Sequence, residues 1–407
     1  MEVITGVLGG IVATAFAGAY ACFHTMPESV TRRKLHRLFR EGELHVRKKR
    51  GKGKEDRLIY PVITRVSSGV DFMQVNFTTP TGMDPQRIFN SLWLFKQGFG
   101  PYIDLSEDCS RFTLVIYSQD MKQFNYDVRD VIPSVKGMGL PVVAGRSRKG
   151  WESYDMVKHP HLLISGETGS GKSVAVRAIL TTLIETHGDN IELYCADLKR
   201  SEFHLFRGIA KRVVVTPEDL EKVLHKINKE MKRRGDLLDA AEKAHVDDLP
   251  NPPKYIMLAI DEVSLLRKHK EIMADIEDIS SIGRALGIFL ILSMQRPDAK
   301  ILDGALKNNL TVRMAFRQSD EINSRIALGS GEAADIRMSQ RGRMYLKGEE
   351  LKMIQMPYLE LEEAKKLLAP RKKEQPIKNR PDAIDVEFEV VEETQTDDDG
   401  EDFLGVL

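Results

Sequence analysis

Apolar runs of five to seven residues recur along residues 146–368, and amphipathic stretches with helical spacing separate them. Uninterrupted apolar runs are typical of strands that are buried on both faces. Their alternation with helices predicts an α/β fold, in which a mostly parallel sheet is covered by helices on both sides. The predicted strands span residues 161–165, 191–197, 211–215, 255–261, 288–294 and 310–316.

Residues 58–145 show a different pattern, in which short β-rich runs at 60–66, 72–77 and 111–117 flank a helical stretch near 85–97. This pattern predicts a small α+β domain that precedes the larger one. The segment contains no recognisable catalytic constellation. The predicted organisation is an anchor over 1–25, a basic linker over 26–57, the small domain over 58–145, the large domain over 146–368 and a tail over 369–407.

One apolar run is long enough to cross a membrane. Residues 3–23 contain no charged side chain, and a helix of this length rises about 30 Å, which matches a bilayer core. Glu2 precedes the run and a basic cluster at 32–34 follows it, which places the rest of the chain in the cytoplasm. We therefore predict a single-pass protein of the cell membrane. A cleaved signal peptide is the alternative, because small residues near the end of the run resemble a cleavage site.

Net charge identifies no partner, because Lys+Arg and Asp+Glu both total 60. The distribution is uneven. The basic segment over 26–57 suits contact with anionic headgroups or nucleic acid, and it equally suits a solvated linker. The tail over 369–407 becomes acidic and poor in core-forming residues, which predicts a disordered or partner-bound end. The three cysteines are far apart, which excludes a disulfide framework or a CxxC metal site and predicts free, buried thiols.

The most specific motif is Gly166-Glu-Thr-Gly-Ser-Gly-Lys-Ser173, which follows an apolar strand and precedes a helix. It matches G-x-x-x-x-G-K-[ST] in the context that this motif requires. Glycines let successive N–H groups face phosphates, and the helix N-terminus adds partial positive charge. Lys172 supplies a charge for the β- and γ-phosphates, and Ser173 supplies an oxygen for Mg²⁺. The predicted ATP-binding residues are Gly166, Glu167, Thr168, Gly169, Ser170, Gly171, Lys172, Ser173 and Val174.

Such a site also needs a carboxylate at the end of a neighbouring strand. Residues 255–260 run directly into Asp261 and Glu262. Two acids that end a buried strand are costly unless they hold a metal ion or a water molecule. We predict that Asp261 binds Mg²⁺ together with Ser173, and that Glu262 polarises the attacking water. An exposed strand end with incidental acids is the alternative.

Two further candidates flank the strand at 288–294. Gln295 ends this strand, where a neutral donor is placed to sense the γ-phosphate. Arg284 stands just before the strand, and in a ring of subunits such an arginine reaches a neighbour's γ-phosphate and stabilises transition-state charge. From spacing alone, a surface arginine at a helix end is the simpler interpretation. The predicted catalytic residues are thus Glu262, Lys172, Gln295 and Arg284.

At these residues the chain closely resembles the FtsK/SpoIIIE branch of the FtsK–HerA ring ATPases, over about residues 151–348. Each matching segment is modest alone, and their shared order is highly specific. The segments are His159-Pro-His-Leu-Leu with the loop at 166–174, Ala196-Asp-Leu-Lys199, Met231-Lys-Arg-Arg234, Ala259-Ile-Asp-Glu262, Gly283-Arg-Ala-Leu-Gly-Ile288, Met294-Gln-Arg-Pro297, Val312-Arg-Met-Ala-Phe-Arg317, Asn323-Ser-Arg325 and Gly342-Arg-Met-Tyr-Leu346.

The resemblance implies a P-loop NTPase of the RecA-like kind that uses ATP and Mg²⁺. It further implies a homo-hexamer that passes double- or single-stranded DNA through a central channel. In this family Gln295 would sense the nucleotide and Arg284 would act across the subunit interface, with Arg313 and Arg317 as rivals for that role. The small α+β domain loosely resembles the second tier of such rings.

The layout departs from the septal chromosome translocases of the family, which have several membrane spans, a long linker and a winged-helix module. One predicted span, a short linker and an acidic tail instead resemble the coupling ATPases of conjugative elements. We therefore expect a membrane-anchored DNA translocase that delivers DNA to a conjugation channel, with a relaxase and mating-channel proteins as partners. The alternatives are chromosome segregation at division or sporulation, a ring ATPase of protein secretion, and a non-catalytic tether.

Overall fold

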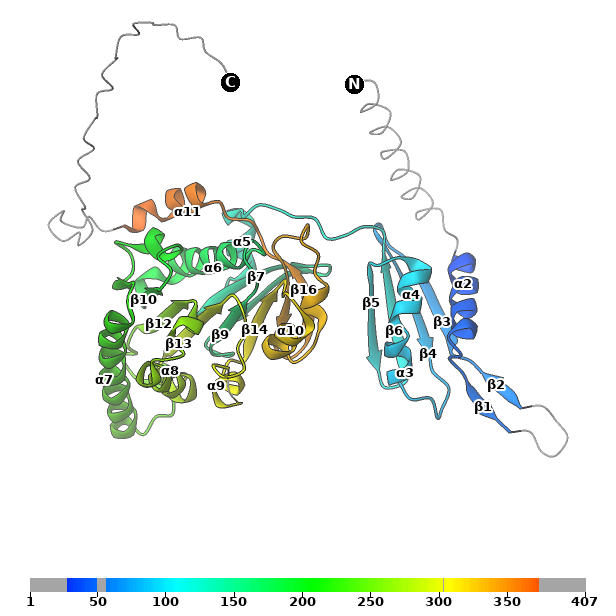
Figure 1. Ribbon diagram of the computed structural model, residues 1–407, viewed down its shortest axis with the longest axis horizontal. Coiled ribbons are helices and arrows are strands. Elements are labelled where there is room, and N and C mark those ends of the chain that lie inside the picture. The colour runs from blue at the N-terminus through cyan, green and yellow to red at the C-terminus, as the bar shows by residue number, and fades with distance from the viewer. Residues whose placement is uncertain (1–27, 50–55, 303, 373–407) are drawn as a thin grey trace, which may run out of the picture. The chain divides into compact units, whose positions relative to one another are not determined.

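The computed structural model describes residues 28–49, 56–302 and 304–372, and it divides the chain into two compact units (Figure 1). The first unit ends at Gln123 and the second begins at Phe124. The predicted anchor over 1–25 and nearly all of the predicted tail over 369–407 lie outside the described residues. Within the three described ranges, no helix combines the length and the apolar character needed to cross a bilayer.

The smaller unit combines an antiparallel sheet with short helices. Its elements are α2 (Glu28–Glu41), β1 (Val46–Lys48), β2 (Arg57–Ile59), β3 (Val62–Ser68), β4 (Phe72–Thr78), α3 (Gln86–Asn90), α4 (Leu92–Phe99), β5 (Ile103–Asp108) and β6 (Arg111–Tyr117). The four-stranded sheet has the order β3-β4-β6-β5. Met73, Val75 and Phe77 alternate with less buried residues along β4, because successive side chains of a strand point to opposite faces.

The structure differs from the predicted linker over 26–57, because α2 belongs to the folded core of the smaller unit. Leu35, Leu38 and Phe39 are buried on one side of this helix and pack with side chains of the sheet. Helical spacing leaves only every third or fourth residue apolar. The many basic residues between them therefore obscured the helix in the sequence.

The larger unit is an α/β domain. Its elements are α5 (Val128–Ser134), β7 (Pro141–Ser147), β8 (Gly150–Asp155), β9 (Leu162–Ser165), α6 (Lys172–His187), β10 (Ile191–Asp197), β11 (Arg212–Val214), α7 (Pro217–Ala241), β12 (Tyr255–Asp261), α8 (Lys270–Ile282), β13 (Ile288–Met294), α9 (Gly304–Asn309), β14 (Val312–Phe316), α10 (Glu321–Leu328), β15 (Arg343–Lys347), β16 (Leu351–Gln355) and α11 (Leu361–Leu368). Short 3₁₀ turns join several of them.

One ten-stranded sheet runs through the larger unit in the order β11-β10-β12-β13-β9-β14-β15-β16-β7-β8. The first six strands are parallel, and the last four join the sheet in antiparallel pairs. The predicted α/β class with a mostly parallel sheet is therefore confirmed. The predicted boundary after residue 145 differs from the structure, because β7 pairs with β16 and β8 and lies in the core of the larger unit.

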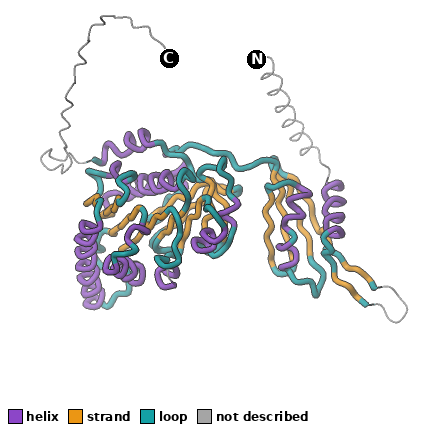
Figure 2. The backbone as a smooth tube through the Cα atoms, viewed as in Figure 1, coloured by secondary structure: helices purple, strands orange, loops and turns teal. Residues whose placement is uncertain are grey.

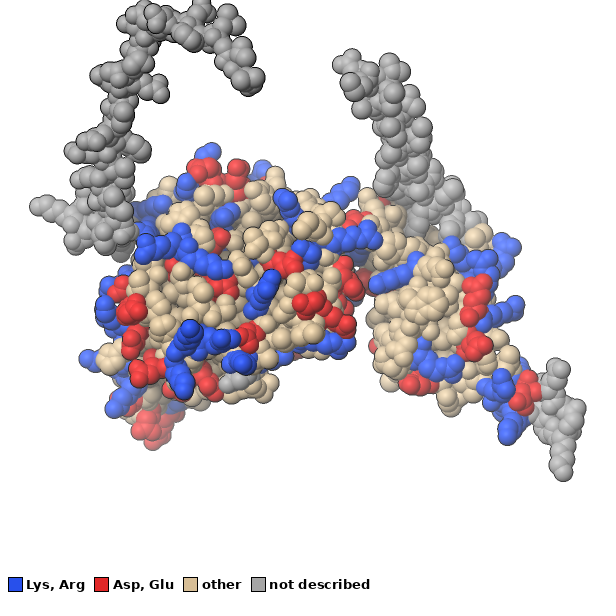
Figure 3. Space-filling view, viewed as in Figure 1, with Lys and Arg blue, Asp and Glu red and all other residues tan. Residues whose placement is uncertain are grey.

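Helices cover both faces of this sheet, as Figures 1 and 2 show. Met257 and Ala259 of β12 pack in the core that contains α6 and α11. Their neighbours Ile256, Leu258 and Ile260 pack in the opposite core, which contains α7 and α8. Burial on both faces explains why the central strands are uninterrupted apolar runs. Acidic and basic side chains are interspersed over the visible surface of this unit (Figure 3).

Two of the three cysteines lie in the described residues, and both are free thiols. Cys195 on β10 is buried, and burial raises the pKa of its thiol. Cys109 is exposed, so the expectation of buried thiols is wrong at this position. Cys109 has a left-handed backbone (φ 58°) in the turn between β5 and β6, and turn residues lie on the surface.

His161 directly precedes β9 rather than belonging to it, because its backbone is left-handed (φ 62°). Its imidazole Nδ1 accepts a hydrogen bond of 3.1 Å from the backbone N–H of Leu290 on β13. The residue is fully buried, and burial lowers its pKa from 6.5 to about 4. The folded chain therefore keeps His161 neutral at a pH where the unfolded chain takes up a proton.

This difference predicts that acid weakens the fold through His161. Below pH 6.5 the unfolded state gains a proton that the folded state rejects until about pH 4. The free energy of unfolding should therefore fall by up to roughly 1.4 kcal/mol per pH unit across this window. Urea unfolding of the wild type and of His161→Asn at several pH values measures the effect. Asparagine tolerates positive φ and keeps an acceptor. Equal pH slopes for the two proteins would contradict the prediction.

Candidate nucleotide site

The phosphate-binding loop lies between β9 and α6, in the strand–loop–helix order that the motif predicts. Gly169 and Gly171 have positive φ values of 77° and 113°, which let backbone N–H groups turn toward an anion. A Cβ on Gly171 would lie 2.9 Å from the Cα and N atoms of Gly342. The N–H of Gly342 donates to the carbonyl of Ser170 at 2.8 Å. The loop therefore rests on the segment that precedes β15.

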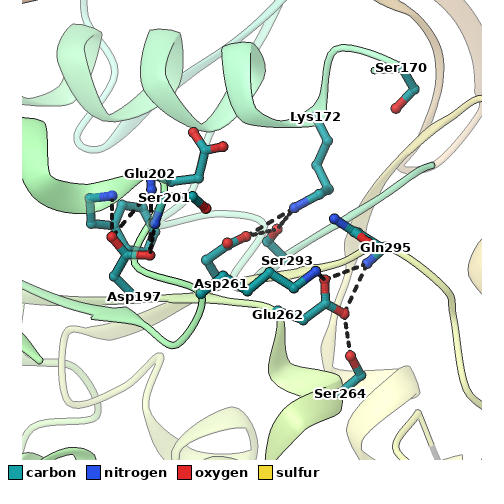
Figure 4. Close-up of polar contacts among 12 residues, drawn as sticks. Ser170, Lys172, Asp197, Ser201, Glu202, Asp261, Glu262, Ser264, Ser293 and Gln295 are labelled. Carbon is teal, nitrogen blue, oxygen red and sulfur yellow. Dashed lines mark hydrogen bonds and ion pairs between the residues drawn. The ribbon is translucent and has the colours of Figure 1, made fainter. Parts of the chain in front are cut away.

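Lys172 reaches from this loop to the end of β12. Its Nζ lies 3.0 Å from Oδ1 of Asp261 and 2.8 Å from Oγ of Ser293 (Figure 4). The hydroxyl of Ser293 donates to the same Asp261 oxygen at 2.9 Å. All three side chains are buried. The structure thus brings together the lysine and the carboxylate that the sequence predicted from separate motifs.

The two motifs are not on neighbouring strands, contrary to the expectation, because β13 lies between β9 and β12. Ser293 of β13 bridges the gap, and the sequence analysis missed it. A signal was present, since Ser293 is the one polar residue in the run 288–294. A polar group at such a position is costly unless it has a partner. Here the partners are Lys172 and Asp261.

Glu262 lies beside this cluster and is held by several donors (Figure 4). Its Oε2 accepts from Nζ of Lys199 at 2.7 Å, and its Oε1 accepts from the hydroxyl of Ser264. The backbone N–H of Gln295 lies 3.2 Å from each carboxylate oxygen. Glu262 has a left-handed backbone (φ 59°), a conformation that costs a non-glycine residue about 1–3 kcal/mol. Such strain is typical of functional sites.

A second carboxylate fixes the loop that carries Lys199. Asp197 ends β10, and its oxygens accept from the backbone N–H groups of Ser201, Glu202 and Phe203 at 2.9 to 3.4 Å. Asp197 is buried, and its carboxylate oxygens stabilise the turn by accepting these backbone hydrogen bonds. The segment Ala196-Asp-Leu-Lys199, one of those that resemble the family, thus contains a carboxylate that stabilises a turn (Asp197) and a lysine that contacts Glu262 (Lys199). The sequence analysis assigned no role to either residue.

The predicted arginines occupy different edges of the sheet. Arg284 is exposed and precedes β13, so it lies at the amino edge of the parallel strands, opposite the phosphate loop of its own chain. Gln295 follows β13 at the carboxyl edge and reaches Glu262 through its backbone N–H. Arg313 donates to the carbonyls of Leu310 and Lys307 at 3.1 and 2.5 Å. Arg317 pairs with Glu167 of the phosphate loop.

The residues present fit a nucleotide and Mg²⁺. Hydroxyl and carboxylate oxygens are the ligands that Mg²⁺ prefers, and Ser173 at the start of α6 and Asp261 at the end of β12 offer one of each. In the described part of the chain, the hydroxyl of Ser173 makes no hydrogen bond to protein. Thr168 and Gly169 form the exposed tip of the loop, and Val174 lies in the first turn of α6.

Known sequences match the part of the chain that contains the site. Residues 140–343, just over half of the chain, match the FtsK/SpoIIIE family. DNA translocase FtsK of Staphylococcus epidermidis is 33% identical over 216 residues, which cover 48% of this chain and 27% of that protein. DNA translocase FtsK of Chlorobaculum tepidum is 29% identical over 250 residues, or 56% of this chain and 31% of that protein. The chain thus aligns with only about a quarter to a third of these relatives' length.

Solved structures share the fold over a larger part of the chain. The pCW3 conjugation coupling protein TcpA, in monomer form with ATPγS, superposes with a TM-score of 0.58 at 23% identity. That match covers 77% of this chain and 94% of TcpA. The cytoplasmic domain of the type VII secretion ATPase EccC of Thermomonospora curvata has a TM-score of 0.51 at 24% identity, over 58% of this chain and 31% of EccC. At these levels of identity, the two likenesses show a shared fold.

Proposed function

Because the chain belongs to the FtsK/SpoIIIE family of ATPases, we propose that it is a membrane-anchored, ATP-driven DNA translocase that delivers DNA to a conjugation channel. The observation that carries the proposal is the buried contact of Lys172 with Asp261 and Ser293, next to Glu262. This cluster combines a cation for phosphate, an oxygen ligand for Mg²⁺ and a carboxylate for water at one edge of the sheet.

Each residue has a defined task in ATP hydrolysis. Lys172 leaves Asp261 and turns its ammonium toward the β- and γ-phosphates. Ser173 and Asp261 would hold Mg²⁺, and the bound ion would neutralise phosphate charge. Glu262 orients the water that attacks the γ-phosphate and accepts a proton from that water. Gln295 lies beside Glu262 and senses whether the γ-phosphate is present. The N–H groups of the loop from Gly166 to Gly171 hold the phosphate oxygens.

Conjugation is favoured by the likeness to TcpA, a conjugation coupling protein, which covers nearly the whole of that chain. The chain also combines a predicted membrane segment with a small α+β unit and an ATPase unit. A relaxase and mating-channel proteins would then be its partners. Membrane attachment through residues 3–23 is tested by comparing the membrane flotation of the full chain with that of residues 26–407.

Two other assignments have support of their own. The sequence relatives are named DNA translocase FtsK, and the resemblance to the septal chromosome translocases of this family makes chromosome segregation an alternative. The likeness to EccC, a type VII secretion ATPase, makes protein secretion another. Genes for a relaxase and a mating channel beside this gene would favour conjugation, whereas an isolated housekeeping locus would favour segregation. A polypeptide that stimulates the ATPase in place of DNA would favour secretion.

We further propose that six copies form a ring in which Arg284 completes the site of the adjacent copy. Support comes from the position of Arg284 before β13, at the amino edge of the parallel strands, which is the edge opposite its own phosphate loop. Arg313 and Arg317 are weaker candidates, because both already have partners within their own chain. The ring is tested by sedimentation of the full chain with ATPγS and DNA.

The test of the proposed function is the rate of ATP hydrolysis by the full chain in detergent, with and without long DNA. We expect DNA to raise the rate severalfold at low salt and less at high salt, because phosphate contacts weaken as salt rises. Lys172→Ala is the negative control. A rate that DNA leaves unchanged at low salt would remove the support for DNA translocation.

A further inference from the structure

The phosphate loop contains an acidic side chain of its own, and one arginine pairs with it. Glu167 is the second residue of the loop, and its carboxylate forms an ion pair with the guanidinium of Arg317. Arg317 directly follows β14, the parallel strand beside β9, so both residues lie at the carboxyl edge of the sheet. The two side chains are only 21% and 26% exposed. The pair is therefore partly shielded from water.

Main-chain contacts hold the same two segments together. The N–H of Glu167 donates to the carbonyl of Arg317 at 3.0 Å. The next residue, Gln318, donates from Nε2 to Oγ of Ser165 at 3.0 Å. The hydroxyl of Ser170 donates to the carbonyl of Glu167 at 2.6 Å, within the turn that leads to Lys172. The shape of the loop thus depends on the end of β14 as well as on its own glycines.

A carboxylate in this loop opposes the binding of a polyanion. The loop has to accept the negative charges of a nucleotide's phosphates, and like charges a few ångströms apart repel each other more strongly where protein replaces water. Arg317 places a permanent positive charge against Glu167. The pair is locally neutral, so its repulsion of phosphate largely disappears. Loss of the arginine alone would restore that repulsion.

On this basis, and resting on the proposed ATPase function, we propose that Arg317 is a positioning residue of the nucleotide site that neutralises Glu167 and holds the loop ready for phosphate. It acts through Glu167 and does not touch the nucleotide. This role is distinct from action across a subunit interface, for which family resemblance makes Arg317 a rival of Arg284. A guanidinium that pairs with the loop of its own chain is not presented to a neighbour.

The test measures the Kd of a fluorescent, non-hydrolysable ATP analogue with Mg²⁺ for the full chain and three variants at low salt. Arg317→Gln should bind the analogue about tenfold more weakly, because Glu167 is left without a counter-charge. Glu167→Gln should bind at least as tightly as the wild type. The double variant should recover to within about twofold of Glu167→Gln. Arg129→Gln removes an exposed ion pair with Asp127 elsewhere in the unit and serves as the matched control.

The double variant makes the outcome decisive. A double variant as weak as Arg317→Gln, or an Arg317→Gln variant with unchanged Kd, would overturn the role, even if its kcat falls. High salt should shrink the defect of Arg317→Gln, since screening weakens repulsion at a partly exposed site. Thermal unfolding without nucleotide identifies any loss of fold, and recovery of binding in the double variant rules out misfolding as the cause. A wild type that fails to bind the analogue would instead overturn the proposed ATPase function, and this role with it.

Discussion

Replacement of Glu262 by glutamine should leave ATP bound and reduce its hydrolysis by about 10²- to 10⁴-fold, the usual contribution of a general base. Glutamine preserves the size of the side chain but cannot accept the proton of the attacking water. Lys199 would lose its anionic partner at 2.7 Å, and its side chain is 32% exposed, so water can solvate the ammonium. The fold should therefore survive. Steady-state hydrolysis together with the Kd of the ATP analogue measures both parts of the prediction.

Glu271→Gln is a suitable control for this experiment, because Glu271 is an exposed glutamate in the first turn of α8. It should hydrolyse ATP at the wild-type rate. If Glu262→Gln keeps the wild-type rate, another group activates the water and the assignment of Glu262 fails. If Glu262→Gln instead loses ATP binding, the side chain serves the architecture of the site rather than the chemistry.

Replacement of Lys172 by alanine should weaken ATP binding and reduce hydrolysis by at least about 10²-fold, as expected when a donor to developing charge is removed. The change also leaves Asp261 buried with Ser293 as its remaining side-chain donor. Removing one partner of a buried ion pair is destabilising, so the unfolding temperature should fall as well. Lys222→Ala removes a lysine that is 67% exposed and pairs with Asp219. This control should keep the ATP affinity, the hydrolysis rate and the unfolding temperature of the wild type.

The same variant tests the trans action proposed for Arg284. Lys172→Ala subunits retain Arg284, and Arg284→Ala subunits retain an intact phosphate loop. If the arginine completes the site of an adjacent copy, a mixture of the two inactive variants should recover part of the ATPase activity. A mixture that stays inactive, or an Arg284→Ala protein that is fully active alone, would contradict action across the interface.

The central strands were predictable because their physical cause is local. The predicted spans 191–197, 255–261 and 288–294 coincide with β10, β12 and β13. Burial on both faces makes such strands continuously apolar, and a functional or capping polar group then ends them. His161 shows the limit of this signal, since its left-handed backbone excludes it from β9 despite an apolar environment.

Strand order was not predictable from the residues, because every parallel strand presents the same apolar pattern. The position of β13 between β9 and β12 is set by packing of the whole sheet. The sequence marks Ser293 only as a polar residue in an apolar strand, and its partners Lys172 and Asp261 are identified by the fold. The same holds for Lys199, whose partner Glu262 lies 63 residues away. The ion pair of Glu167 with Arg317 likewise joins two motifs that the sequence keeps 150 residues apart.

The close approach of Gly171 to Gly342 restricts which residues can occupy either position. A methyl group on Gly171 would lie 2.9 Å from the backbone of Gly342, and one on Gly342 would lie 2.8 Å from Nε2 of Gln355. The methyl group on Gly171 would meet main chain, whereas the one on Gly342 would meet a side chain. Gly342 also has a positive φ of 75°, which disfavours any residue with a Cβ. Residue 342 is far from the motif in sequence, yet glycine is favoured there for the same reasons as at residue 171, namely a positive φ and little space for a side chain.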